Sequence, residues 1–331
     1  MEPEMQPTPE EPPAAETDFE QVAAVDSPAP RRRHDLSWLF LGEEGLRAGW
    51  SVLLFSALTF AFLVVASLVV MSMLKALRLN PSEGMSAGST IRERGVWLLA
   101  FAGAGWMVAR IEGRRLVDFY LRGRQWLLHF ATGLVTGFAT LSVLVGVLSL
   151  GGWLHFGAPA LTGGRILLYA GWWSAGFLLV GLTEEGSFRC YLQFTLTRGL
   201  NFWWALGIVA FLSGDLLLRA KGNGAWGVYV MALLGLVPCL LLELRKAPGS
   251  GFWQAAWVTS TAFGFIHTGN NGENWIGIFA AGAIGFVFCV SVRVTGSAWW
   301  AIGCHAAWDW AETYFYGTAD SGMPARGHFL T

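Results

Sequence analysis

The stretch Glu184-Glu185-Gly186-Ser187-Phe188-Arg189 places two adjacent carboxylates and an arginine in sequence that is otherwise apolar enough for a lipid bilayer. A charge near the centre of a bilayer costs about 3 kcal/mol or more, so charged residues in membrane helices are rare and mark functional sites. Two further polar groups lie in equally apolar settings, namely His267 and the pair His305 and Asp309. The sequence therefore predicts a polar site enclosed by membrane helices.

The composition of the whole chain agrees with a membrane location. Hydrophobic residues make up 54% of the 331 residues and charged residues only 14%, compared with about 25% charged residues in soluble domains. A membrane-spanning helix needs about 20 mainly apolar residues, and this criterion predicts an all-α, polytopic transmembrane bundle of about eight or nine spans. The expected spans lie near residues 50–74, 96–110, 126–151, 165–184, 202–219, 225–243, 252–268, 274–292 and 297–315.

The amino-terminal segment, residues 1–34, is predicted to be a disordered cytoplasmic leader. Residues 1–30 contain eight acidic residues, no Lys or Arg, and seven of the twelve prolines, and such a composition cannot bury enough apolar surface to fold. Residues 35–50 mix Trp, Leu and Phe with charged residues, as an interfacial helix does. Transmembrane helices are then expected over residues 51–151.

The distribution of basic residues predicts the orientation. Three arginines at positions 31–33 precede the first span, and five more lie between Arg110 and Arg124. The positive-inside rule places both clusters in the cytoplasm. Arg92 and Arg94 are expected in the loop between the first two spans, on the opposite side, which weakens the asymmetry. We expect an integral protein of the plasma (inner) membrane with a cytoplasmic amino terminus.

Helical spacing predicts how the first polar group is arranged. If residues 165–198 form one helix, Glu185 and Arg189 are four positions apart and share a face, while Glu184 points about 100° away. The arginine can then hold Glu185 and leave Glu184 unpaired, which suits a general base that activates water. The alternative is a purely structural Glu-Arg pair that joins two helices.

The other two polar groups repeat the same spacing on separate helices. Phe263 and His267 are four apart, with Gly264 between them allowing close helix contact. His305 and Asp309 are also four apart, so the carboxylate can accept a hydrogen bond from one imidazole nitrogen and orient the other. Each pair alone could be structural, but three such groups on three apolar helices indicate one shared cavity.

The three motifs resemble those of a known family, the CAAX-prenyl-protease and bacteriocin-processing (CPBP, or Abi) intramembrane proteases. That family carries EExxxR, FxxxH and HxxxN or HxxxD on separate helices, and this chain has Glu184–Arg189, Phe263–His267 and His305–Asp309 in that order. The resemblance covers residues 165–312 and implies a protease core over residues 165–315. Residues 202–243 lie between the first two motifs as an inserted helical pair, and residues 316–331 form a tail.

The resemblance also implies roles for the motif residues. Glu184 would activate the hydrolytic water and His267 would position it, while Glu185 and Arg189 would brace the site. His305 and Asp309 would stabilise the oxyanion, as donors aimed at developing negative charge do. An ionised aspartate is only an acceptor. Asp309 must therefore be protonated, orient His305 or bind a metal.

The nitrogen and oxygen donors of the motif residues would also allow a metal site. Glu184, His267 and His305 could ligate a catalytic Zn²⁺ with an open coordination position, although the HExxH spacing is absent.

We expect an intramembrane endopeptidase that cleaves membrane-anchored, prenylated or hydrophobic peptides in the lipid bilayer, with no nucleic-acid partner. The alternatives are a non-catalytic scaffold or immunity protein of the same fold, and a proton-coupled transporter.

Overall fold

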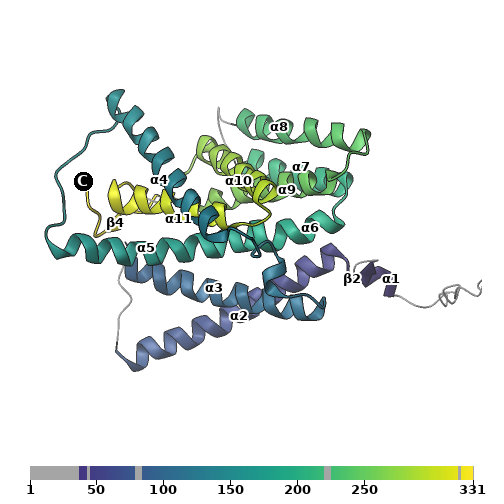
Figure 1. Cartoon of the computed structure of the whole chain (residues 1–331), viewed down its shortest axis with the longest axis horizontal. Helices are drawn as coiled ribbons and strands as arrows, with labels where there is room; N and C mark the ends of the chain where they lie inside the picture. Colours follow the sequence, from purple (N-terminus) through teal and green to yellow (C-terminus); the bar gives the residue numbers. More distant parts are fainter. Residues whose placement is uncertain (1–36, 43–44, 79–83, 220–224, 320–321, 331) are drawn as a thin grey trace, which may run out of the picture.

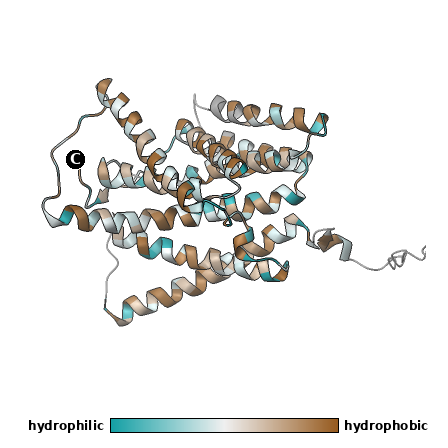
Figure 2. Ribbon diagram, in the orientation of Figure 1, coloured by the Kyte–Doolittle hydropathy of each residue, from teal (hydrophilic) through white to brown (hydrophobic). Residues whose placement is uncertain are grey.

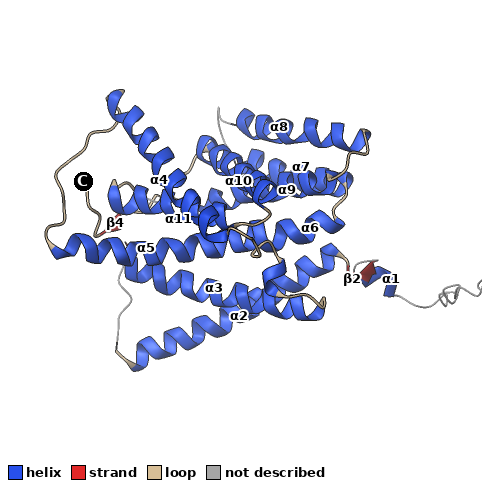
Figure 3. Ribbon diagram, viewed as in Figure 1, coloured by secondary structure: helices blue, strands red, loops and turns tan. Residues whose placement is uncertain are grey.

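The computed structural model describes residues 37–42, 45–78, 84–219, 225–319 and 322–330. The predicted disordered leader, residues 1–34, lies outside the described residues. The described part is mainly helical, with four strands of two residues each (Figure 3). Its helices are α1 Ser37–Phe40, α2 Ala48–Ala76, α3 Ala87–Ile111, α4 Trp126–Leu150, α5 Gly164–Glu185, α6 Gln193–Gly199, α7 Phe202–Arg219, α8 Ala225–Leu244, α9 Ser250–Ile266, α10 Trp275–Thr295 and α11 Trp299–Trp310.

The helices confirm the predicted fold class, a helical membrane bundle. Four segments of the described chain are long and apolar enough to cross a bilayer: Ala48–Ala76, Trp126–Leu150, Gly164–Gly199 and Trp275–Thr295. Apolar residues make up much of each helix (Figure 2), and on α2 large side chains such as Phe60 are exposed, as contact with lipid requires. The predicted total of eight or nine spans stays a prediction, because several remaining helices are shorter or carry charges.

The long segment that contains the first motif occupies the middle of the molecule (Figure 1). Helices α2 and α3 pack on one side of it, and α7 to α10 lie on the other. This segment was expected to be one regular α-helix over residues 165–198, but α5 and α6 are joined by a π-helix, η2, Gly186–Leu192. A second π-helix, η4, Ala311–Phe315, follows α11. Such wide turns frequently occur at functional sites, and each of these begins within two residues of a motif residue.

The described residues of the expected interfacial segment, residues 35–50, do not form one continuous helix, and its location at the membrane interface stays a prediction. The structure has the short helix α1 and two paired strands, β1 Leu41–Gly42 and β2 Gly45–Leu46, before α2 begins. Gly45 has a φ of 102°, a value that a right-handed helix cannot contain. A helix therefore cannot run continuously through this position into α2.

Glycines allow close packing of the helices that carry the second and third motifs. On α4, Gly133 and Gly137 face the backbone carbonyls of Trp300 and Cys304 on α11 so closely that a Cβ at either position would overlap them. On α9, a Cβ at Gly264 would approach the carbonyl oxygen of Ile278 on α10 to 2.7 Å, which confirms the predicted close contact. Small residues let membrane helices approach in this way. These contacts fix the position of α11 against α4 and that of α9 against α10.

The carboxyl-terminal residues, which the sequence predicts to be a tail, pack against the helical bundle. Strand β4, Ala325–Arg326, pairs in parallel with β3, Met85–Ser86, just before α3. The indole Nε1 of the buried Trp173 on α5 donates to the carbonyl oxygen of Gly327 at 3.2 Å. The carboxyl-terminal residues thus link the strand before α3 to the first half of α5.

Candidate active site

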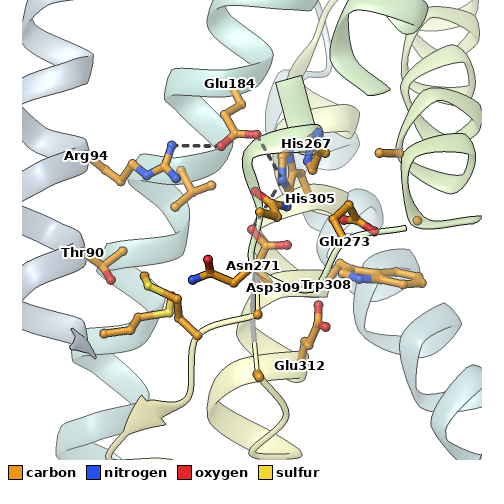
Figure 4. Close-up of a pocket in the computed structure, with 18 of the residues that line it drawn as sticks. Thr90, Arg94, Glu184, His267, Asn271, Glu273, His305, Trp308, Asp309 and Glu312 are labelled. Atoms are coloured by element: carbon orange, nitrogen blue, oxygen red, sulfur yellow. Dashed lines mark hydrogen bonds and ion pairs between the residues drawn. The ribbon is translucent and has the colours of Figure 1, made fainter. Parts of the chain in front are cut away.

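A cavity of about 860 Å³ lies between α3, α5, α9, α10 and α11. Glu184, His267, His305 and Asp309 line it together (Figure 4), although they come from three widely separated parts of the chain. The carboxyl-terminal residues Gly322 and Met323 form part of its wall. The three motifs therefore share one cavity, as their spacing indicated.

Glu185 and Arg189 lie behind the cavity wall. Both side chains have no exposed surface, and Nε of Arg189 is 3.1 Å from Oε2 of Glu185. The predicted pairing at this spacing is present even though a π-helix begins between the two residues. Burying an ion pair this deeply costs desolvation free energy unless other groups compensate its charges. The other contacts of Glu185 and Arg189 should therefore supply that compensation.

Aromatic rings surround the Arg189 guanidinium. Its central carbon lies 4.2 Å from the ring centroid of Phe263 and 5.4 Å from that of Phe288, distances at which a cation is attracted to the ring face. Its terminal nitrogens have no hydrogen-bond partner among the described residues. Gly285 on α10 leaves the space they occupy, since a Cβ there would overlap the guanidinium. Gly285 was not predicted, because it belongs to none of the motifs.

His305 connects the buried pair to the cavity. Its Nδ1 lies 2.7 Å from Oε1 of Glu185, and its Nε2 lies 3.4 Å from Oδ2 of Asp309 and 3.8 Å from Oε2 of Glu184. Carboxylates only accept hydrogen bonds, so a ring protonated on both nitrogens matches this environment. Asp309 thus lies where it can accept from His305, as the spacing predicted.

Glu184 is not the unpaired carboxylate that the sequence indicated. Its Oε1 accepts a hydrogen bond of 2.9 Å from the guanidinium of Arg94, with side-chain exposures of 17% for Glu184 and 32% for Arg94. Arg94 was expected in a loop, but α3 begins at Ala87 and carries it inside the bundle. The correction follows from helix length, because the hydropathy criterion placed the start of this helix at residue 96.

His267 lines the cavity from the short 3₁₀ helix η3, His267–Gly269, that follows α9. Its Nδ1 lies 2.6 Å from the carbonyl oxygen of Phe263. A carbonyl oxygen can only accept, so Nδ1 carries the proton and donates. In a neutral ring Nε2 is then the acceptor, which can hold a water molecule by one of its hydrogens.

The arrangement of the potential ligands gives no support to the predicted zinc site. Among the described residues, no three His, Cys, Asp or Glu side chains are placed to share an ion. The Nδ1 of His267 is bonded to a backbone carbonyl, and both nitrogens of His305 face carboxylates. We therefore derive no catalytic step that involves a metal.

The inserted pair, α7 and α8, packs against α9 through a separate apolar cluster that includes Phe202, Val209 and Trp257. No described side chain from either helix lines the cavity.

Comparison with known proteins gives one result. The family model of Type II CAAX prenyl endopeptidase Rce1-like matches residues 238–311. This confirms the resemblance noted from the sequence, over a segment that contains the second and third motifs but not Glu184, Glu185 or Arg189. No curated protein and no solved structure matches the chain.

Proposed function

We propose that this integral membrane protein, which carries an Rce1-like segment, is an intramembrane endopeptidase that hydrolyses peptide bonds with water activated by Glu184. One observation carries the proposal: Glu184, His267 and His305 line the same cavity inside the bundle. A carboxylate base, an imidazole acceptor and an imidazole donor around one space are the groups that amide hydrolysis by water needs.

In the proposed reaction, a water molecule held by His267 Nε2 gives a proton to Glu184 as its oxygen attacks the substrate carbonyl carbon. Negative charge develops on the carbonyl oxygen, and the Nε2–H of protonated His305, which lies 3.4 Å from Asp309, turns to share its hydrogen bond with that oxygen. When the C–N bond breaks, Glu184 passes its proton to the leaving amine. Glu184 acts in this scheme first as base and then as acid, so no other proton carrier is required.

Asp309 has a supporting role in this scheme. Its carboxylate lies 3.4 Å from Nε2 of His305 and cannot donate to an oxyanion while ionised. We assign it to orienting the imidazole and compensating its charge, the second of the three roles that the sequence left open.

The substrates we propose are membrane-anchored, prenylated or hydrophobic peptides. On the α10 side, the cavity is lined by small and apolar side chains, including Ala280, Ala281 and Ile284, which suits an apolar group of the substrate. The family description names a prenyl endopeptidase, so a prenylated peptide is the first substrate to test. The proposed location is the plasma (inner) membrane with the amino terminus in the cytoplasm.

The proposal is tested by cleavage in proteoliposomes. The substrates are a quenched fluorescent peptide with a prenylated cysteine near its carboxyl end and a panel of tagged membrane proteins. Glu184→Gln and His267→Ala should each abolish the product. The matched control is Glu93→Gln, which makes the same chemical change at an exposed glutamate of the same cavity and should keep it.

Each rival has its own outcome in this assay. A scaffold or immunity protein gives no product from any substrate, with wild type and variants alike. A proton-coupled transporter gives a pH-driven flux across the same vesicles. Loss of cleavage on adding a chelator, restored by Zn²⁺, would mean that the site gathers a metal and that the metal-free mechanism is wrong.

A further inference from the structure

The site contains two Glu-Arg pairs that differ in their surroundings. Glu185 and Arg189 are fully buried, whereas Glu184 and Arg94 both line the cavity and keep part of their side chains exposed. A buried pair braces the fold. A partly exposed pair contributes little to stability, so the position of Arg94 calls for another explanation.

The first turns of α3 are built to place Arg94 opposite Glu184. Ser86 caps this helix, because its hydroxyl accepts from the backbone nitrogen of Ser89 at 3.2 Å and its own nitrogen donates to the Ser89 hydroxyl at 2.9 Å. One turn before Arg94, Thr90 is packed against Gly176 of α5, where a Cβ would lie 3.4 Å from the threonine methyl. The charged turn Ile91–Arg94 is thus held helical against the segment that carries Glu184.

The Glu184 carboxylate has two oxygens with different surroundings. Oε1 accepts the 2.9 Å hydrogen bond from Arg94, and Oε2 lies 3.8 Å from His305 Nε2, beyond direct hydrogen-bond distance. Among the described residues, the one other cationic group within 4.0 Å of this carboxylate is an imidazolium at His305. Without Arg94, the carboxylate would close on the imidazole and fill the space between them.

We propose that Arg94 is a positioning residue of this site: it fixes one oxygen of Glu184 and keeps the other apart from His305, directed into the cavity. The inference rests on the proposed function, in which that second oxygen takes the proton from water. Figure 4 shows the arrangement, with Arg94 and His305 on opposite sides of the Glu184 carboxylate.

The test compares steady-state cleavage of the prenylated fluorescent peptide by wild type, Arg94→Ala, Arg94→Lys and Arg92→Ala in proteoliposomes. A base misplaced by about 1 Å costs on the order of 100-fold in rate, so kcat of Arg94→Ala should fall by about that factor while KM changes less than about threefold. Arg94→Lys should recover part of the rate, since it keeps the charge but loses the planar fork. Arg92→Ala removes a positive charge from the same helix and cavity and should have a much smaller effect.

Chemical rescue separates positioning from a structural role. Because Arg94 borders a cavity, guanidinium ions at a low, non-denaturing concentration should enter the space left in Arg94→Ala and raise its kcat. Sodium chloride at the same ionic strength should not. Guanidinium should leave Arg92→Ala unchanged, and the melting temperature of Arg94→Ala in detergent should stay close to that of wild type.

Three results would overturn the inference: an Arg94→Ala kcat within about threefold of wild type, a raised KM with unchanged kcat, or no response to guanidinium. Glu184→Gln, assayed alongside, separates this failure from that of the proposed function. If Glu184→Gln is inactive and Arg94→Ala keeps a kcat within about threefold of wild type, only the role of Arg94 is wrong. If wild type does not cleave, or Glu184→Gln cleaves as wild type does, the proposed function fails and this inference with it.

Discussion

The Nδ1 atom of His305 lies 2.7 Å from Oε1 of Glu185, a residue 120 positions earlier in the chain. The other oxygen of the same carboxylate faces Arg189 at 3.1 Å. Glu185 therefore joins the fully buried pair to the imidazole at the cavity. The adjacent glutamates have different surroundings as a result, because only Glu184 reaches the cavity, and this difference predicts opposite effects when each is changed.

Glu185→Gln should destabilise the protein strongly. The substitution keeps the size of the side chain but leaves the buried Arg189 guanidinium without its counter-charge, and breaking one partner of a buried ion pair costs about 3–5 kcal/mol. The melting temperature in detergent, followed by tryptophan fluorescence, measures the loss. Glu184→Gln is the matched control and should melt near wild type while losing cleavage. Equal melting temperatures for the two variants would contradict the division of roles.

The cleavage rate of Asp309→Asn should stay within about tenfold of wild type, whereas that of Asp309→Ala should fall on the order of 100-fold. The carboxamide oxygen of asparagine can still accept a hydrogen bond from Nε2 of His305, and alanine cannot. Initial rates with the prenylated peptide give the comparison. If asparagine is as damaging as alanine, the negative charge of Asp309 matters rather than its acceptor, and its assignment as an orienting residue must change.

Gly285→Ala should reduce stability by about 1–3 kcal/mol, the usual cost of an added methyl group in a packed interior. The new Cβ would overlap the Arg189 guanidinium and also lie 3.4 Å from the Phe263 ring, so the arginine must leave its position between the aromatic rings. Thermal unfolding in detergent measures the change. Gly146→Ala on α4 is the control, because a Cβ there meets no atom within 4 Å; it should be neutral or slightly stabilising.

The helical fold and the shared cavity could be predicted from the sequence, for physical reasons. Apolar runs of sufficient length indicate membrane helices, and the energetic cost of a charge in lipid favours gathering Glu184, His267 and His305 in one polar cavity. The spacing of four residues also predicted the contacts of Glu185 with Arg189 and of His305 with Asp309, which the structure contains.

The remaining parts of the site depend on tertiary contacts. Arg94 lies in the charged run Ile91–Arg94, which hydropathy assigns to a loop, and only packing against α5 makes it part of the cavity. Gly285 has meaning only once Arg189 is known to point at α10. Strand β4 pairs with β3 across 240 positions of the chain, and two residues of strand have no sequence pattern of their own.

The last prediction concerns this pairing. Deleting residues 324–331, which keeps Met323 in the cavity wall, should loosen the start of α3, because it removes β4 and the acceptor of the Trp173 indole. Backbone amides of residues 85–90 should exchange hydrogen faster, as measured by mass spectrometry, and the melting temperature should fall. Arg326→Ala is the control, since its side chain is exposed and the strand is held by backbone bonds. Because Thr90 lies one turn before Arg94, the cleavage rate should fall together with the protection of these amides from exchange. Unchanged exchange in the truncated protein would mean that packing against α5 alone holds the start of α3.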